Sequence, residues 1–499
     1  MRPKDCHCCL WAMAVCTVFP LFERVVAWSE MMIQMSPKPS LTRLVVIIPG
    51  IGGTILREPN GLRRRVWGHQ RATLVAAGLD SDRLSLGNHP ELEPDGLVRD
   101  VQPVPGWTVV AGYHHIGKAI FNAFGDVVLD GGSVPGNVME FGYDFRKSVV
   151  HAATELDKAI GERLRSFPSG TRVVLVGHSL GGLVARYWIG RCGGSKICDG
   201  LITLGTPHRG APKALNVLAN GIRVSRLKLD TLSRVVADWD SLYELLPDYS
   251  MIWDPVAATY VLPDALGNLA VRARKAARIH QEINDWCGIS PLPTWAYFGS
   301  GNATFRTARL EGDIVQMDLS LQPSGATRPL FEEPDLWVGD GTVPSEAGTP
   351  IELETKSNEK YPVAHRHAML PRDASEHVVD ALRKIHGIRS TPLRGDGEDP
   401  MNPRPHISLG MDDFYLRSST IEIVAQHRDT GELEVIGTNV DILDESARCQ
   451  PVQLNVSSNG TTVAHFDAPV SGVFEVCVAS TLSDGSSIEA RDLFCVVDE

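Results

Sequence analysis

The stretch "TRVVLVGHSLGGLVARYWIG" (residues 171–190) places Ser179 between Gly177 and Gly181, directly behind an apolar run. The run predicts a buried strand over 172–177, and the residues after the serine predict a helix over 180–192. A G-x-S-x-G sequence at a strand-to-helix turn lifts its serine above the sheet and places it at a helix N-terminus. We therefore interpret Ser179 as a nucleophile. The alternative is a serine in a glycine-rich turn, because the pentapeptide alone is a weak signal.

Further apolar runs alternate with helical patterns along the chain. Strands are expected over 44–50, 200–207, 294–301 and 336–344, and helices over 154–167 and 375–387. Continuous apolar strands separated by helices are typical of a parallel sheet covered on both faces. The sequence therefore predicts an α/β fold with a doubly wound, mostly parallel sheet.

The pattern changes after a segment rich in Pro, Gly and charge. Short runs of alternating polarity follow it, with turn signals at Asn459-Gly460 and Asp484-Gly485, and these predict a small all-β sandwich of the immunoglobulin type. The expected organisation is an N-terminal extension (1–35), a catalytic α/β domain (36–390), a linker (391–405) and the sandwich (406–499).

The composition disfavours several classes of partner. A net charge of −12 argues against a broad nucleic-acid footprint and against constitutive attraction to anionic lipid surfaces. The ten cysteines lack the paired spacing of a zinc site. Cys192 and Cys198 either bridge a loop or remain free thiols. We expect no metal and no cofactor, and the sequence gives no indication of an oligomeric state.

The N-terminus permits two interpretations of localisation. Arg2 and Lys4 precede an apolar stretch over 9–22, which is too short for a comfortable membrane span. No other stretch approaches that length, so no integral membrane segment is expected. We predict a cytoplasmic protein; the alternative is secretion, with residues 1–27 acting as a signal peptide.

A serine nucleophile needs a base and an orienting acid, which in this type of fold follow it in the order Asp, His. Asp340 lies in the glycine loop of "WVGDGTVP" and is the expected acid; the alternative is an ordinary Asp-Gly turn. His365 and His367 lie in a loop before the last helix, where a base can reach over the sheet. His377 and His386 fall inside that helix and are expected to be solvated or core residues.

An oxyanion hole needs two preformed donors. One is expected from the N–H of Leu180, at the start of the helix after the serine. The other is expected from the loop "PGIGGT" (49–54), where glycines let the backbone approach a substrate closely. Gly52 is the candidate, and Ile51 is the neighbour that a one-residue shift of register would select.

Seven stretches together resemble the lecithin:cholesterol acyltransferase family of α/β-hydrolases, in that family's order and across residues 44–390. They are "VVIIPGIGGTIL" (45–56), "FGYDFR" (141–146), "VGHSLGGLVARY" (176–187), "ITLGTPHRGAP" (202–212), "ELLPDY" (244–249), "GDGTVP" (339–344) and "HAMLP" (367–371).

The resemblance implies an α/β-hydrolase fold and a role for each matched residue. It implies Ser179 as nucleophile, Asp340 as acid and His367, rather than His365, as base. It also implies Gly52 and Leu180 as oxyanion donors. The reaction implied is acyl transfer from a lipid ester through an acyl-enzyme to an alcohol or to water. Asp144 and Arg146 match a structural acid–guanidinium element, and the lid and acyl-binding elements would fall within 214–290.

Two departures from the family keep other functions open. Residues 50–150 contain no cysteine, so the disulfide-pinned membrane-binding insertion of the lipoprotein-associated members is absent. The C-terminal sandwich is not part of the family's core. The alternatives are therefore a carboxylester hydrolase acting on small esters, and a catalytically silent hydrolase fold used as a binding module.

Overall fold

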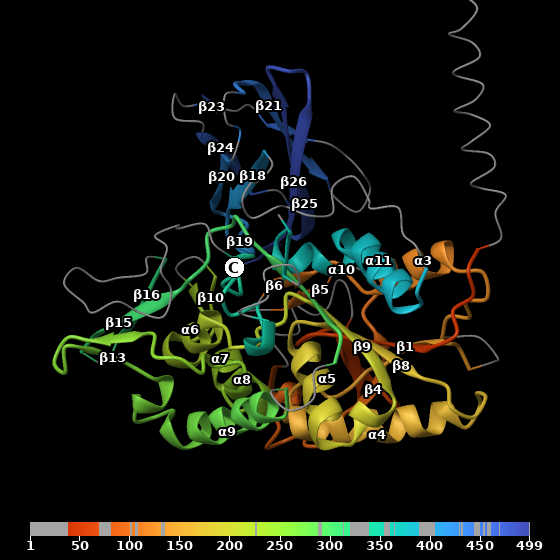
Figure 1. Ribbon diagram of the computed structural model, residues 1–499. Helices are drawn as coiled ribbons and strands as arrows, with labels where there is room; N and C mark the ends of the chain where they lie inside the picture. Colours follow the sequence, from red (N-terminus) through yellow and green to blue (C-terminus); the bar gives the residue numbers. More distant parts are fainter. Residues whose placement is uncertain are drawn as a thin grey trace, which may run out of the picture.

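The structure is a computed structural model that places most of the chain between residues 38 and 498. The residues it describes are 38–68, 81–99, 102–104, 108–130, 135–224, 227–287, 292–312, 314–319, 339–353, 360–363, 365–388, 405–428, 430, 433–443, 450–452, 455–456, 461–468 and 470–498. Two bodies are visible in Figure 1, an α/β body and a smaller all-β body stacked on one end of it.

A six-stranded sheet forms the centre of the α/β body. Its order is β17-β14-β9-β8-β1-β7, and every neighbouring pair is parallel. The strands are β1 (Leu44–Ile48), β7 (Val138–Glu140), β8 (Val173–His178), β9 (Cys198–Leu204), β14 (Thr294–Gly299) and β17 (Lys360–Val363). β1 and β8 are buried along their whole length because helices cover both faces.

The helices of the α/β body lie in two layers. α3 (His114–Ala123) and α11 (Ser375–Ile385) cover one face of the sheet, and α4 (Val149–Leu164) and α5 (Leu180–Arg191) cover the other (Figure 1). The chain leaves β1, returns as β7 on one side of it, and then continues through β8 on the other side. The carboxyl ends of β1 and β8 therefore meet at a topological switch point, where α/β folds bind their ligands.

Two insertions surround this switch point. The first lies between β1 and β7 and contains β2 (Thr54–Arg57), β3 (Arg65–Trp67), η1 (Ser81–Leu84), β4 (Glu93–Leu97), β5 (Gln102–Val104) and β6 (Thr108–Val110). The second follows β9 and contains α6 (Pro212–Asn220), β10 (Arg223–Val224), β11 (Leu227–Lys228), α7 (Asp230–Val236), α8 (Asp240–Glu244), β12 (Ile252–Asp254), β13 (Thr259–Val261), η3 (Pro263–Ala265) and α9 (Ala270–Cys287).

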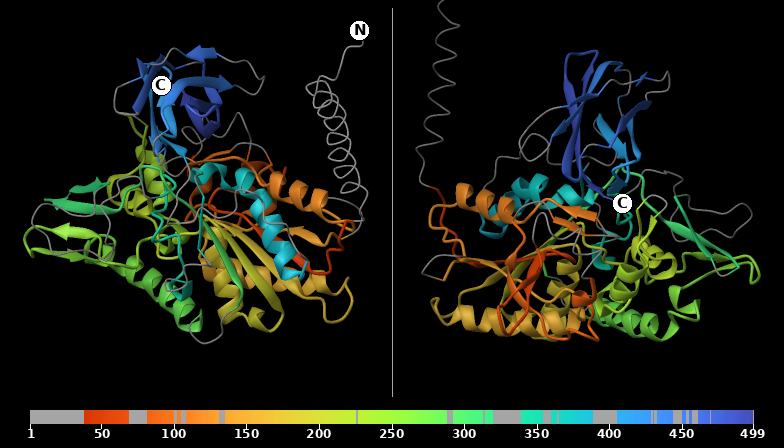
Figure 2. Two further views of the ribbon diagram at one scale, coloured as in Figure 1. Left: turned by 45° about the horizontal axis from the view of Figure 1, so that its top comes forward. Right: turned by 180° about the vertical axis from the view of Figure 1, so that it is seen from behind.

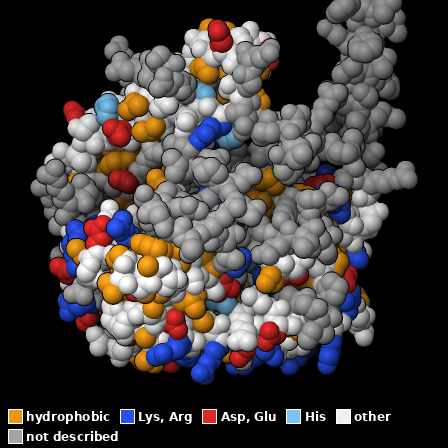
Figure 3. All heavy atoms as spheres, turned by 60° about the vertical axis from the view of Figure 1, so that its left-hand side comes forward, with side chains coloured by type: hydrophobic (Ala, Val, Ile, Leu, Met, Phe, Trp, Pro, Cys, Tyr) orange, Lys and Arg blue, Asp and Glu red, His pale blue; other side chains and the backbone are white. Residues whose placement is uncertain are grey.

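Part of the second insertion joins a small mixed sheet at the side of the molecule. Its order is β13-β12-β15-β16, with β15 (Thr307–Glu311) and β16 (Ile314–Asp318) contributed by the chain after β14. Val256 and Ile314 are exposed at the two hairpin turns of this sheet. Basic, acidic and apolar side chains alternate over this side of the molecule (Figure 3).

The all-β body consists of two sheets packed face to face. One has the order β18-β20-β24-β23 and the other β19-β26-β25-β21-β22. The strands are β18 (His406–Gly410), β19 (Phe414–Leu416), β20 (Thr420–Arg428), β21 (Val435–Leu443), β22 (Gln450–Val452), β23 (Asn455–Val456), β24 (Thr461–Asp467), β25 (Gly472–Leu482) and β26 (Ser487–Val497). Alternate residues, such as Ile421, Ile423 and Phe494, form its core.

The structure confirms the predicted fold class, a doubly wound parallel sheet followed by a small β sandwich. The Asp484-Gly485 turn also forms, with the Gly485 N–H donating to the Leu482 carbonyl at 2.9 Å. The Asn459-Gly460 turn, the extension over 1–35 and all but the last residue of the linker over 391–405 lie outside the described residues. The domain bounds therefore stay predictions.

One predicted strand was misplaced. Of the expected strand over 336–344, residues 336–338 lie outside the described residues, and Asp340 forms only an isolated bridge with Asn302. The sheet also contains β7, where no strand was expected, and its sixth strand is β17, which was likewise not predicted. Pro362 obscured it, because proline is normally excluded from a sheet interior. β17 is an edge strand, where proline is tolerated.

The fold makes a testable prediction about the glycines after the serine. A Cβ on Gly182 would lie 2.0 Å from the Oγ1 atom of Thr206, which is buried. We expect Gly182→Ala to lower the free energy of unfolding by about 1–3 kcal/mol in urea titrations.

Gly161→Ala is the matched control, because Gly161 lies on the exposed side of α4 with nothing within 4 Å of the added Cβ. This variant should raise the free energy of unfolding by about 0.5–1 kcal/mol, as expected for a glycine inside a helix. Equal effects at the two positions would contradict the packing described for Gly182.

Candidate active site

Ser179 lies at a strained turn between β8 and α5. Its backbone is held at φ 51° and ψ −124°, a region that non-glycine residues rarely occupy. The glycines around it allow two close backbone contacts. A Cβ on Gly177 would meet the Gly182 Cα at 2.7 Å, and a Cβ on Gly181 would meet the Ile48 carbonyl oxygen at 2.3 Å. The pentapeptide therefore forms the predicted strand-to-helix turn, with the serine at the helix N-terminus.

The structure brings the three predicted catalytic residues together. The Nε2 atom of His367 lies 3.0 Å from the Ser179 Oγ atom, and its Nδ1 atom lies 2.8 Å from the Asp340 Oδ2 atom. All three side chains are buried. Because the carboxylate accepts the proton on Nδ1, Nε2 is left free to accept the hydroxyl proton of the serine.

The acid is fixed from several directions. The other carboxylate oxygen of Asp340 accepts hydrogen bonds from the N–H groups of Thr342 and Val343, at 2.9 and 2.7 Å. The Asp340 carbonyl accepts the His367 N–H at 2.9 Å. These bonds hold the carboxylate in one orientation and link the backbones of acid and base.

Two strand ends make room for this pair by carrying glycine. A Cβ on Gly205, after β9, would lie 3.0 Å from the His367 Nδ1 atom, and φ at this residue is 55°. A Cβ on Gly299, at the end of β14, would lie 2.2 Å from the Asp340 Cβ atom. Neither glycine was singled out from the sequence. Their position at the ends of predicted strands is the signal that would have found them.

The loop expected to supply an oxyanion donor is a tight turn against the serine. The Gly53 N–H donates to the Gly50 carbonyl at 3.0 Å, and Gly52 has a φ of 74°. A Cβ on Gly50 would lie 2.8 Å from the Ser179 Cβ atom. Among the described residues, the N–H groups of Ile51, Gly52 and Leu180 donate no hydrogen bond. In the described part of the chain, therefore, none of the three is occupied by another acceptor.

A buried tyrosine connects this turn to the residue before the serine. The Tyr113 hydroxyl accepts the Gly50 N–H at 2.8 Å and lies 2.7 Å from the His178 Nδ1 atom. Since the hydroxyl proton has Nδ1 as its acceptor, we assign the His178 proton to Nε2. Burial lowers the pKa of His178 well below its usual value. A neutral His178 adds no second positive charge beside His367, whose ring centroid lies 5.1 Å away.

The other three histidines near the end of the α/β body lie outside this constellation. The Nδ1 atom of His365 faces the Asp373 carboxylate at 3.7 Å, and burial lowers its pKa. His377 stacks on Tyr297, and the His386 Nδ1 atom lies 2.7 Å from the Leu382 carbonyl in its own helix. The structure therefore places His367, and not His365, against the serine.

The acid–guanidinium element lies beneath the site. Asp144 and Arg146 form a buried bidentate pair with N–O distances of 2.7 and 2.8 Å. Arg146 also donates to the carbonyl of His89, at 3.0 Å. The pair therefore joins the chain after β7 to the first insertion.

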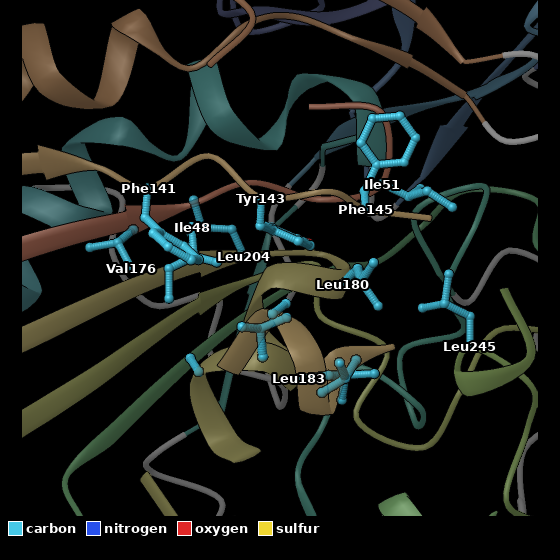
Figure 4. Packing of buried hydrophobic residues seen from close by; sticks show 14 of the residues in the cluster. Ile48, Ile51, Phe141, Tyr143, Phe145, Val176, Leu180, Leu183, Leu204 and Leu245 are labelled. Atoms are coloured by element: carbon cyan, nitrogen blue, oxygen red, sulfur yellow. The ribbon is translucent and has the colours of Figure 1, made fainter. Parts of the chain in front are cut away.

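Apolar side chains surround the elbow, the turn from β8 to α5 that carries Ser179. Ile51, Leu180 and Leu245 lie around the start of α5, and Tyr143 and Phe145 lie beside the turn after β1 (Figure 4).

In the part of the chain that is described, no group of three or more His, Cys, Asp or Glu residues is placed to hold a metal ion. Within that same part, no helix is long and apolar enough to span a membrane. Cys192 and Cys198 are free thiols.

Comparison with known proteins finds a family match over part of the chain. Residues 111–285 match the family model "Lecithin:cholesterol acyltransferase". The lecithin-cholesterol acyltransferase-like protein 4 of Arabidopsis thaliana is 22% identical over 84% of this chain and 85% of its own length. An uncharacterized protein of Saccharomyces cerevisiae is 28% identical, but that match covers 33% of this chain and only 23% of the yeast protein.

Among solved structures, the mature form of a Bacillus licheniformis lipase is similar to this chain with a TM-score of 0.33 and 12% identity. The match covers 70% of this chain and 94% of that structure.

The tyrosine bridge makes a prediction about stability. Tyr113→Phe leaves the Gly50 N–H and the His178 Nδ1 atom buried without their partner. We expect the free energy of unfolding to fall by about 1–3 kcal/mol. Tyr187→Phe is the matched control, because the Tyr187 hydroxyl bonds to the partly exposed Glu282 at 3.1 Å. If, in parallel urea titrations, Tyr113→Phe lowers the free energy of unfolding no more than Tyr187→Phe does, the bridge is refuted.

Proposed function

Because residues 111–285 match the family model "Lecithin:cholesterol acyltransferase", we propose that this chain transfers acyl groups from lipid esters through a covalent ester on Ser179. The observation that carries the proposal is the hydrogen-bonded relay from Ser179 through His367 to Asp340. The distance between Ser179 Oγ and His367 Nε2 is 3.0 Å, and the distance between His367 Nδ1 and Asp340 Oδ2 is 2.8 Å. A nucleophile, a base and an orienting acid in this order are the requirements of serine acyl transfer.

In the first half-reaction His367 Nε2 takes the proton of the Ser179 hydroxyl while Oγ bonds to the ester carbonyl carbon. The tetrahedral intermediate collapses when the bond from that carbon to the alcohol oxygen breaks. His367 then returns its proton to the leaving alcohol. In the second half-reaction an acceptor hydroxyl loses its proton to His367 and attacks the acyl carbon. The bond between the acyl carbon and Ser179 Oγ then breaks, and His367 returns the proton to the serine oxygen. Asp340 balances the charge of the imidazolium throughout.

The oxyanion is proposed to bind the N–H of Leu180 and one N–H of the loop after β1. Our sequence prediction for the second donor is Gly52. The contact geometry favours its neighbour Ile51, because Gly50 lies against the serine and the next amide along the chain belongs to Ile51. Ile51 and Leu180 together would present two donors beside Ser179.

The family and the apolar surroundings of the elbow support a lipid ester as the acyl donor. Buried Ile51, Leu180 and Leu245 favour an acyl chain over a polar group. The acceptor is proposed to be an alcohol, and with water as acceptor the same site is a lipase. The competition between the two depends on how well water is excluded from the acyl-enzyme.

Labelling with a fluorescent fluorophosphonate tests the nucleophile. The wild-type chain should become covalently labelled on the peptide containing Ser179, and Ser179→Ala should lose the label, as read by gel fluorescence and peptide mass spectrometry. Labelling of both proteins, or of neither, would refute the serine mechanism. Incubation of the wild type with a diacyl phospholipid, with and without a long-chain alcohol, then shows whether the acyl group leaves as an ester or as a free acid.

Two neighbouring histidines provide a matched test of the base. His367→Asn should reduce the labelling rate by about 100-fold or more, because the serine loses its general base. His365→Asn should leave the rate within about two-fold of wild type, because His365 faces Asp373 and not the serine. The reverse pattern would assign the base to His365.

A further inference from the structure

The edge strand of the sandwich contacts the loops that carry both the acid and the base. β18 has one neighbour, β20, within its sheet. The Leu409 N–H and C=O point away from β20, as they do at alternate positions of an antiparallel edge strand. The N–H donates to the Asn302 Oδ1 atom at 3.2 Å, and the C=O accepts from Arg366 Nη1 at 2.8 Å.

Each of these two partners is directly connected to one residue of the relay: Asn302 to the loop of Asp340, and Arg366 to His367. Asn302 pairs with the acid loop, its N–H donating to the Gly339 carbonyl at 3.0 Å, next to Asp340. Arg366 directly precedes His367. Its guanidinium also lies over Gly341, whose added Cβ would be 3.1 Å from the Arg366 Cζ atom.

Two carboxylates of the sandwich hold the Arg366 guanidinium. The Asp492 Oδ2 atom, on β26, lies 2.5 Å from Arg366 Nε, and the Asp413 Oδ1 atom lies 3.8 Å from Nη2. Asp413 also binds Lys213 of α6 at 2.7 Å. Asp492 is buried, and burial raises its pKa to about 6, whereas the charge of the neighbouring Arg366 lowers it.

Apolar packing surrounds this polar contact. Ala368 and Met369, which follow His367, pack with Phe414, Leu493 and Cys495 of the sandwich and with Val109 and Ala111 of the first insertion. Arg366 and Asp492 are both buried there, and a buried guanidinium left without its carboxylate would be strongly destabilising. Figure 2 shows the sandwich seated on this end of the α/β body in both views.

We propose that the C-terminal sandwich is part of the catalytic apparatus, with Arg366 as a positioning residue that fixes the His367 loop through Asp492 and Leu409. The inference rests on the proposed function, since it assigns a role in the chemistry of Ser179. We call these contacts of Arg366 with Asp492 and Leu409 the clamp. Without the clamp, His367 is still present, but its loop loses the contacts that set the distance between His367 Nε2 and Ser179 Oγ. A displacement of about 1 Å is enough to cost about 100-fold in rate.

The same interface offers a matched control. Arg372 of α10 (Leu370–Asp373) forms a second ion pair with the sandwich, its two terminal nitrogens lying 3.1 and 3.2 Å from the Glu475 carboxylate. This pair is half-buried and lies five residues beyond His367. Arg372→Met therefore loosens the interface without touching the base, whereas Arg366→Met releases the base loop itself.

The test compares full-length wild type with Arg366→Met, Arg366→Lys, Asp492→Asn and Arg372→Met. Hydrolysis of p-nitrophenyl butyrate gives kcat and KM, and fluorophosphonate labelling gives the rate of nucleophilic attack. We expect Arg366→Met to lower kcat and the labelling rate by about 10- to 100-fold with KM within about two-fold. Arg366→Lys should recover part of kcat, Asp492→Asn should lower it, and Arg372→Met should keep it within about two-fold.

Thermal unfolding of each variant separates positioning from folding. If Arg366→Met does not fold, Asp492→Asn and Arg366→Lys carry the comparison. Normal kcat in folded Arg366→Met and Asp492→Asn would overturn the inference, as would an equal loss in Arg372→Met, because a general loosening of the interface would then explain the data. An unlabelled wild type refutes the proposed function itself, whereas a labelled wild type with indifferent Arg366 variants refutes only the clamp.

Discussion

The strained backbone of Ser179 is the constraint on which the rest of the α/β body depends. A φ of 51° at a serine costs about 1–3 kcal/mol, and such a residue persists only where its surroundings over-determine it. β8 is paired on both sides, by β1 and by β9, so the strand end cannot relax. Gly181 and Gly182 then bring α5 so close to the end of β1 and to Thr206 that any side chain there would collide. The strain at one residue is thus held by strand pairing and by glycine contacts together.

The members of the relay come from distant parts of the chain, and each is held by its own contacts. Asp340 is fixed by the N–H groups of its own loop and by Gly299 behind it, and His367 is fixed through its N–H to the Asp340 carbonyl. Tyr113 joins the turn after β1 to His178. Nucleophile, base and the proposed oxyanion loop are therefore preorganised by a network of main-chain and side-chain hydrogen bonds, so that little reorganisation is needed when charge develops during reaction.

The central strands, the elbow and the three residues of the relay could be predicted because each leaves a local signal. β1 and β8 are continuous apolar runs, and the relay residues follow in the order that the fold requires. What escaped prediction depends on tertiary contacts. β17 was missed because it contains Pro362, a residue more typical of loops than of strands. Tyr113 and Arg366 gave no signal, since their partners lie 63 and 43 or more residues away in the chain.

The edge position of β18 has a consequence for solubility. An open sheet edge presents unpaired N–H and C=O groups on which a second chain can pair, and proteins commonly cover such edges. Here the outward N–H and C=O of Leu409 bind Asn302 and Arg366 of the α/β body instead. The contact that joins the two bodies thereby also removes a template for strand addition between molecules, so that keeping the edge covered guards the protein against self-association.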